Sequence, residues 1–268
     1  MKTTSLAKFV FILMTAVLVL GACAPAVVNT PAPTAVPVEP TAAPATVYRI
    51  ASDATWPPFE SVNESTKAIE GFDIDLLTAI ATEAGFQFEV VNVGWDALLT
   101  GMAQCQYDGA ISAMTITEDR AKAFNFSDPY LAAGQVVSIN KDTTDIKGVA
   151  DLVGKKIGVQ IGTTGAIESE KIEGAEVKTY DSVDLAFQDL INKQVDAVVA
   201  DYPTAVSFVG VNSDKLMTTG DVFTSEQYGI AVCKTNTELL GLLNKGLTAV
   251  KAKGLIPELE KKWLAAAQ

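Results

Sequence analysis

The sequence predicts an α/β protein built from two units of similar size. Three observations lead to this prediction. Strand and helix signals alternate from Val47 onward. A second set of alternating strands and helices follows the first from Lys155. The chain of 268 residues is also long enough for one or two domains with a sizeable core.

The first set of elements starts with a short strand at 47–52. Gly71 precedes a helix whose apolar residues recur on one face. Apolar and polar residues then alternate at 86–90, which indicates a half-buried strand. Asp96 is placed to cap the next helix, and Tyr107–Met114 has the composition of a buried strand.

The second set repeats this alternation, and two helices close the chain. We expect strands at 155–160, 177–180, 195–200 and 228–233. We expect helices after the turn at 162–165, through 185–191, and at 237–253 and 256–266.

Composition excludes several classes of function. The chain has 20 Lys and Arg against 32 Asp and Glu, and phosphate binding needs a basic surface, so we expect no nucleic-acid partner. It has no histidine, which removes Ser-His-Asp and Cys-His catalysis and the commonest metal ligand. No loop has EF-hand spacing, and we expect neither a metal nor a cofactor.

The N-terminus is predicted to be a targeting segment. Lys2 and Lys8 precede an apolar run at 9–20, which is short for a membrane span. The run ends in Leu20-Gly21-Ala22-Cys23, which resembles the lipobox of bacterial lipoproteins. We therefore expect a signal peptide at 1–22 and lipid on Cys23. Ordinary signal cleavage, with Cys23 incidental, is the alternative.

Residues 23–46 are predicted to be a tether. Ala24–Thr46 holds six of the chain's 11 prolines among Ala, Thr and Val, with Glu39 as its only charge. Such a segment cannot build a core and favours an extended polyproline conformation. At ~3.1 Å per residue its reach is at most roughly 70 Å, which fits a globular body held near a membrane.

The segment Thr115–Arg120 is the first candidate site. Thr117 is suited to cap a helix, and Arg120 falls on the first turn of that helix, close to its exposed amides and to the Thr115 hydroxyl. Amides, a hydroxyl and a guanidinium together can bind a carboxylate. The alternative is a surface arginine paired with a neighbouring acid.

Two further places follow predicted strands. Gly162–Gly165 presents amides and the hydroxyls of Thr163 and Thr164 at a helix start, although it can equally be an ordinary turn. Asp201 ends an apolar strand, so it either caps the next helix or faces a ligand. Ligands bind at the carboxyl ends of strands in open α/β sheets, which favours the prediction that Asp201 faces a ligand.

Trp56 and Trp95 also follow strands. Large aromatic residues are usually part of a core, but Trp56 precedes two prolines in a loop, where aromatic side chains often meet ligands.

These residues belong to a longer set of motifs in which the chain resembles the family 3 extracellular solute-binding proteins. The resemblance runs in order from about Val47 to Trp263. It is carried by Ala51–Glu60, Gly71–Leu76, Thr115–Arg120, Phe126–Tyr130, Gly158–Gly165, Val195–Asp201 and Tyr228–Val232.

The resemblance implies a two-lobe, type II periplasmic-binding-protein-like fold with two hinge crossings and the ligand in the cleft. We expect the crossings near Tyr130–Gly134 and Thr224–Tyr228. Lobe one is then 47–130 with 228–268, and lobe two is 134–224. The resemblance also brings Cys105 and Cys233 to one end of lobe one, where they either form a disulfide or stay as two free thiols.

The resemblance assigns roles to the candidate site residues. Arg120 is expected to bind the ligand α-carboxylate with help from Thr115, Thr164 and nearby amides, and Asp201 to bind the α-ammonium with the main-chain oxygen of Ala113. Trp56 and Trp95 are expected to flank the side chain, and Asp53 to reach its far end. The remaining expected contacts are Ser112, Gln160 and Thr163.

The implied function is capture of a polar amino acid outside the cytoplasm and its delivery to the membrane subunits of an ABC importer. Arg120 and Asp201 are expected to pair with the two charges of the zwitterion, so Asp53 is left without a cation. This favours arginine or lysine as the ligand, then glutamine. We expect a lipid-anchored monomer and no enzyme activity. The alternatives are a ligand-sensing module for a membrane receptor and a dehydratase on the same fold.

Overall fold

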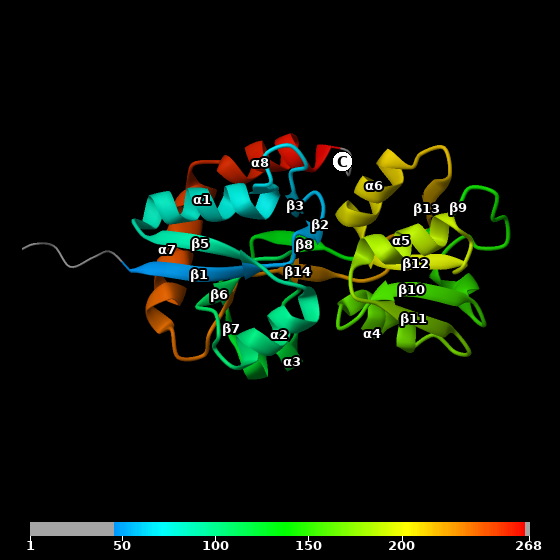
Figure 1. Ribbon diagram of the computed structural model, residues 1–268, viewed down its shortest axis with the longest axis horizontal. Helices are drawn as coiled ribbons and strands as arrows, with labels where there is room; N and C mark the ends of the chain where they lie inside the picture. The colour runs from blue at the N-terminus through cyan, green and yellow to red at the C-terminus, as the bar shows by residue number, and fades with distance from the viewer. Residues whose placement is uncertain (1–45, 266–268) are drawn as a thin grey trace, which may run out of the picture. The chain divides into compact units, whose positions relative to one another are not determined.

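The computed structural model of the protein describes residues 46–265. These residues form two five-stranded sheets with helices packed on them, which confirms the predicted α/β class and the two-lobe fold (Figure 1). The predicted signal peptide, Cys23 and the tether as far as residue 45 lie outside the described residues.

The first sheet has the order β5-β1-β6-β15-β7. In it, β1 (Val47–Ser52) pairs in parallel with β5 (Gln87–Asn92) and with β6 (Gly109–Ala110). β15 (Ala231–Val232) pairs antiparallel with β6 and with the edge strand β7 (Asn125–Phe126). A late segment of the chain thus returns to the sheet that the first strand began. We call the part built on this sheet lobe one.

The second sheet has the order β11-β10-β12-β9-β13, and we call the part built on it lobe two. β10 (Lys156–Gln160) pairs in parallel with β11 (Glu176–Tyr180) and with β12 (Ala197–Asp201). β9 (Gln135–Asn140) pairs antiparallel with β12 and with the edge strand β13 (Leu216–Thr219). All residues of β12 are buried, as its continuous apolar run predicts.

Helices cover the sheets, and a small three-stranded sheet completes lobe one. Lobe one carries α1 (Phe72–Ala84), α2 (Trp95–Ala103), α3 (Glu118–Ala123), α7 (Thr237–Ala252) and α8 (Leu255–Trp263). Its small sheet consists of β2 (Thr55–Trp56), β3 (Glu60–Val62) and β4 (Ile69–Glu70). Lobe two carries α4 (Thr164–Glu170), α5 (Val183–Ile191), α6 (Tyr202–Val211) and the 3-10 turn η1 (Val149–Leu152).

Glycines define both ends of α1. At Gly71 a Cβ atom would lie 2.0 Å from the carbonyl oxygen of Phe59, so no other residue fits the close approach of these two backbones. Gly85 ends the helix in the left-handed conformation, with φ of 79°. Between them, Leu76, Leu77 and Ile80 are fully buried on the face that the apolar pattern predicts.

Two short antiparallel strands connect the lobes. β8 (Leu131–Ala133) pairs with β14 (Glu226–Tyr228), and the chain passes between the two main sheets along these strands. The crossings lie close together, because a Cβ atom on Gly134 would meet the carbonyl oxygen of Thr224 at 2.3 Å. Figure 1 shows β8 and β14 between the two main sheets.

Three local predictions were wrong. The strand predicted at Tyr107–Met114 is shorter, because the backbone leaves the sheet after β6 and Ala113 adopts a left-handed φ of 44°. The strand predicted at 228–233 is instead two strands. β14 belongs to a crossing between the lobes, and β15 belongs to the first sheet. Asp96 does not cap α2, because Gly94 is the N-cap and Asp96 lies in the first turn.

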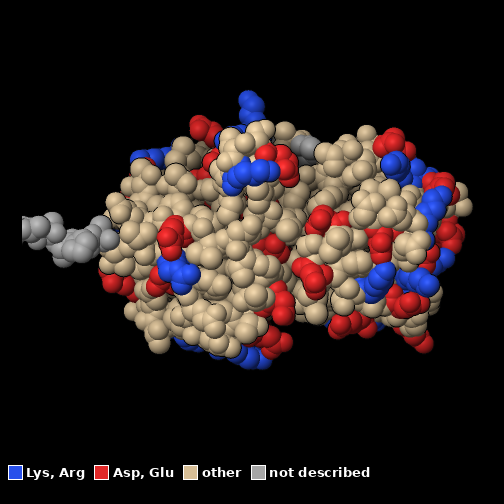
Figure 2. Space-filling view, viewed as in Figure 1, with Lys and Arg blue, Asp and Glu red and all other residues tan. Residues whose placement is uncertain are grey.

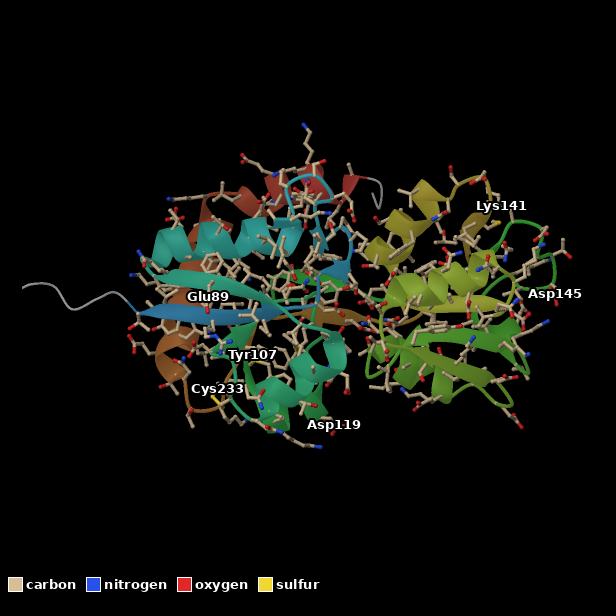
Figure 3. All side chains as sticks on the ribbon, viewed as in Figure 1. Glu89, Tyr107, Asp119, Lys141, Asp145 and Cys233 are labelled. Carbon is tan, nitrogen blue, oxygen red and sulfur yellow. A yellow bond between two sulfur atoms is a disulfide. The ribbon has the colours of Figure 1, made fainter. Side chains whose placement is uncertain are left out.

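A disulfide joins Cys105 and Cys233, whose Cα atoms are 5.0 Å apart. Because β6 and β15 are antiparallel neighbours, the segments that carry the cysteines meet beside Tyr107 (Figure 3). Within residues 46–265, no helix combines the length and apolar character needed to cross a membrane.

Candidate binding site between the lobes

A pocket of about 290 Å³ lies where strands of both sheets end. Its lining contains the candidate residues chosen from the sequence, and they come from both lobes. Parallel strands bring their carboxyl ends to one edge of a sheet, which explains how distant segments converge here. The lining residues are Asp53, Trp56, Trp95, Ser112, Ala113, Thr115, Arg120, Gln160, Thr163, Thr164 and Asp201.

Arg120 is held by the first turn of α3. The Thr117 hydroxyl caps this helix by accepting from the Arg120 amide at 3.2 Å, as predicted. The Arg120 guanidinium donates to the carbonyl oxygens of Thr115 at 2.8 Å and of Gly162 at 3.0 Å, so this side chain joins lobe one to lobe two. It also lies 5.0 Å from the centre of the Trp95 ring, a cation–π geometry. Burial lowers the pKa of Arg120 to about 10, so the side chain stays cationic at neutral pH.

Asp201 does not cap the helix that follows it. It occupies the N-cap position of α6, but its side chain forms no capping hydrogen bond. Instead its carboxylate accepts from the Tyr228 hydroxyl at 2.7 Å and from the Gln135 amide. Burial, and next the charge of Glu226, raises the pKa of Asp201 to about 7. A ligand ammonium group would favour the ionised form of this carboxyl.

Glu226 is a residue that reasoning from the sequence missed. Its carboxylate accepts from the hydroxyls of Thr115 at 2.7 Å and Thr164 at 2.8 Å, which belong to different lobes. It also accepts from Thr224 at 2.8 Å and from Gln135 at 3.2 Å. One signal could have identified it, because Glu226 is the single charged residue of the two predicted crossings.

These contacts bear on the expected roles of Thr115 and Thr164. A hydroxyl has one proton to donate, and in both residues that proton is directed to Glu226. A ligand carboxylate would then depend on the Arg120 guanidinium and on backbone amides rather than on these hydroxyls.

The far end of the pocket is built around Asp53, which is 3% exposed. Its carboxylate accepts from the Thr55 hydroxyl at 2.9 Å and from the Gln160 amide at 2.8 Å, the latter across the lobes. Burial raises the pKa of Asp53, and these hydrogen bonds oppose the rise. The carboxylate is therefore solvated by neutral donors and not neutralised by a cation.

The pocket walls are formed by Trp56 and Trp95, both almost buried, and by the Ser112–Ala113 segment. Each indole nitrogen is without a hydrogen-bond partner among the described residues. Ser112 accepts from the Asp53 amide at 3.0 Å. Thr163 caps α4 and accepts from the Ala166 amide at 3.2 Å.

The described residues give no support to a metal centre. No group of three or more Cys, Asp or Glu in 46–265 is arranged to hold a metal ion. The chemistry of the pocket is that of opposite charges, hydrogen-bond donors and aromatic faces, which suits a small zwitterionic molecule.

Proteins of similar sequence are binding proteins. A probable histidine-binding protein from Neisseria gonorrhoeae is 35% identical over 236 residues, covering 84% of this chain and 86% of the relative. ABC transporter arginine-binding protein 1 from Escherichia coli K12 is 37% identical over 217 residues, covering 78% and 87%.

Solved structures of similar fold carry related descriptions. A mutant of ArgBP from T. maritima has a TM-score of 0.77 and 43% identity, covering 82% of this chain and 95% of the other. The arginine-, lysine-, histidine-binding protein ArtJ from Geobacillus stearothermophilus has a TM-score of 0.78 and 36% identity, covering 82% and 96%. An ancestral arginine-binding protein bound to glutamine has a TM-score of 0.75 and 38% identity, covering 81% and 97%.

The family match agrees with these likenesses. Residues 48–266 match the model of the bacterial extracellular solute-binding proteins, family 3, which takes in both sheets, both crossings and every residue that lines the pocket. The chain therefore belongs to the bacterial extracellular solute-binding proteins, family 3.

Proposed function

We propose that this protein binds a cationic L-amino acid, arginine or lysine before glutamine, and delivers it to an ABC importer. The observation that carries the proposal is the charge of the pocket. Arg120 is its one lining cation, while Asp53 and Asp201 are two lining carboxylates. With both carboxylates ionised, these groups sum to 1 − 2 = −1, which complements a ligand of charge +1.

The zwitterionic part of the ligand would lie at the Arg120 end. Arg120 would bind the α-carboxylate and Asp201 the α-ammonium, so that each buried charge gains a partner. The ligand's side chain would extend toward Asp53 between the two indoles. A cation over an indole gains roughly 0.5–2 kcal/mol. The similarity to arginine-, lysine- and histidine-binding proteins supports this ligand class.

Glutamine is the second candidate. Its side-chain amide can donate to Asp53 and stack on an indole without carrying a charge. The related ancestral protein bound to glutamine supports this alternative. Acidic side chains predominate over the middle of one face (Figure 2). This surface charge does not discriminate between glutamine and a cationic amino acid as the ligand.

A thermal-shift screen against the twenty amino acids tests the proposal. We expect the largest rise in Tm with arginine or lysine, a smaller rise with glutamine, and none with glutamate or aspartate. The Arg120→Ala variant should show no rise with any of them. A preference for glutamate or aspartate would overturn the assignment, because a ligand carboxylate beside Asp53 meets an uncompensated like charge.

The lobes are proposed to close around the ligand, with 47–130 and 228–268 moving against 134–224 at the two crossings. A ligand that bridges Arg120 and Asp201 favours closure because those residues belong to different lobes. Small-angle scattering should show a smaller radius of gyration at saturating ligand. Identical curves with and without bound ligand would contradict closure.

The protein is further proposed to be a monomer held outside the cytoplasm by lipid on Cys23. This rests on the sequence at 20–23 and on the proline-rich segment after it. Membrane fractionation and mass spectrometry of the mature N-terminus test it. We expect Cys23→Ser to release the protein or leave it unprocessed, and a soluble wild type with unmodified Cys23 would refute the anchor.

A further inference from the structure

Two carboxyl groups are buried directly behind the pocket wall. Glu60 on β3 and Asp73 in the first turn of α1 are both 0% exposed. None of the ion pairs within residues 46–265 includes either of them. A buried carboxylate without a cation is costly, and two side by side cost more.

The two groups face each other. The carboxyls of Glu60 and Asp73 are within hydrogen-bonding reach of one another. The oxygens Glu60 Oε2 and Asp73 Oδ1 have no hydrogen-bond donor as a partner among the described residues. Two ionised carboxylates cannot hydrogen-bond, because each only accepts, whereas one proton between them satisfies both oxygens.

Their remaining oxygens hold the pocket wall. Glu60 Oε1 accepts from the Ser112 hydroxyl at 2.9 Å, and that hydroxyl oxygen in turn accepts from the Asp53 amide. Asp73 Oδ2 accepts from the Ala113 amide at 2.7 Å and from the Tyr130 hydroxyl at 2.8 Å. The pair is thus bonded to two consecutive residues of the pocket lining.

Ala113 needs such support. Its φ of 44° lies in the left-handed region, which a residue with a Cβ occupies only when its surroundings hold it there. The hydrogen bond to Asp73 keeps the Ser112–Ala113 peptide turned out of the sheet. Ala113 is also the residue whose main-chain oxygen is expected to face the ligand ammonium.

We propose that Glu60 and Asp73 share one proton, with Glu60 the neutral acid and Asp73 the carboxylate, and that this pair positions the Ser112–Ala113 wall for ligand binding. The role in binding rests on the proposed function, whereas the shared proton does not.

The hydrogen-bond partners set which residue holds the proton. Asp73 accepts from two donors, which favours its charged form, while Glu60 accepts from one hydroxyl and faces two other carboxyls, Asp73 and Asp53. Burial and the charge of Asp73 raise the pKa of Glu60 well above its ordinary value, and burial raises the pKa of Asp73 to about 7. The other titratable group in contact is Tyr130, with Asp201 beyond it.

Infrared spectroscopy of the ligand-free protein tests the shared proton. At pH about 8 ordinary Asp and Glu side chains are ionised. We therefore expect one carbonyl band of a protonated carboxylic acid in the wild type, and its loss in Glu60→Gln. Glu64→Gln, the same change at an exposed site after β3, should retain the band. Absence of the band in the wild type would overturn the proposal, even if no variant folds.

Ligand affinity tests the positioning role, using the ligand identified for the wild type. The side-chain amide introduced by Glu60→Gln can donate to Asp73 as the neutral acid does, so this variant should bind within about threefold of wild type. Asp73→Asn removes the charge that holds Ala113 and should weaken binding by at least about tenfold. Equal losses in both variants would overturn the assignment of the proton to Glu60. A wild type that binds no amino acid would refute the proposed function and leave the infrared result standing.

Discussion

The two ends of the pocket are built differently. Near the crossings, the pocket lining holds the cation of Arg120 and the carboxylate of Asp201, so the charges of the lining balance there, while the carboxylate of Glu226 lies outside the lining. At the other end Asp53 accepts from Thr55 and Gln160, which are neutral, and its negative charge has no counterpart. A balanced end suits the α-carboxylate and α-ammonium common to all amino acids. An unbalanced end suits selection among side chains.

Removing Arg120 should give the largest effect, because it breaks the balanced end. We expect Arg120→Ala to weaken amino-acid binding by on the order of 2–5 kcal/mol, or roughly 30- to 5,000-fold. A desolvated ligand carboxylate would lose its cation. Titration calorimetry gives the dissociation constants. Arg49→Ala, at an exposed arginine of β1, is the control and should bind like the wild type. An Arg120→Ala variant within threefold of wild type would rule out this role.

Neutralising Asp53 should remove the unbalanced charge and so weaken the selection among side chains. A hydrogen bond to a charged group contributes about 1.5–3 kcal/mol, so Asp53→Asn should weaken arginine or lysine binding by about 10- to 150-fold. Glutamine binding should change less, because a neutral amide loses less when the carboxylate becomes an amide. Competition titrations measure the ratio of the affinities. Asp96→Asn, on the exposed side of α2, is the control. An unchanged ratio would place selectivity elsewhere.

The pH dependence of binding should report on Asp201. Burial raises its pKa to about 7, and an ammonium ligand binds the ionised form, so binding below that pH must release a proton. Affinity should be constant above pH about 8 and fall by up to about tenfold per unit below 7. Calorimetry in buffers of different ionisation enthalpy measures the released proton. Affinity that stays flat across this range would contradict the ammonium role.

The raised pKa of Asp201 also makes the stability of the ligand-free protein depend on pH. A carboxyl whose folded pKa exceeds its unfolded value binds more protons when folded. Its contribution is present in full below an unfolded pKa of about 3.9 and is lost as pH rises through about 7. Asp73 acts in the same direction over the same range.

Much of the site could be predicted because its residues sit at strand ends. Asp201 ends a buried apolar strand, and such ends converge at one edge of a sheet, whereas Asp53 and Gln160 were expected only from the family resemblance. The predicted helix cap at Thr117 likewise places Arg120 on the first turn of α3. Local sequence signals therefore located Asp201 and Arg120 at the ends of elements, while the resemblance assigned their roles toward a ligand.

The missed features depend on contacts between distant segments. Glu226 meets Thr115 and Thr164 only after the chain has crossed twice, and its own segment has no periodic pattern. The Glu60–Asp73 contact joins β3 to α1 through the fold of the small sheet. The left-handed Ala113 could not be anticipated either, since alanine has no intrinsic preference for it.

Glu226 should give the smallest effect, because it supports the balanced end without facing the ligand directly. Glu226→Gln keeps one acceptor for Thr115 or Thr164 but removes the charge that binds both hydroxyls, so the link between the lobes weakens. A neutral hydrogen bond contributes about 0.5–1.5 kcal/mol, which predicts a loss of affinity of about two- to twelvefold. Glu168→Gln is the matched control, because Glu168 lines one surface pocket together with Glu226, Thr115 and Thr164 but pairs with Lys171. Calorimetry compares the two variants, and small-angle scattering shows whether Glu226→Gln alone shifts the ligand-free protein toward a larger radius of gyration. If both variants behave like the wild type, the link through Glu226 does not contribute to closure, and the contacts of Arg120 with Gly162 and of Tyr228 with Asp201 join the lobes at this end.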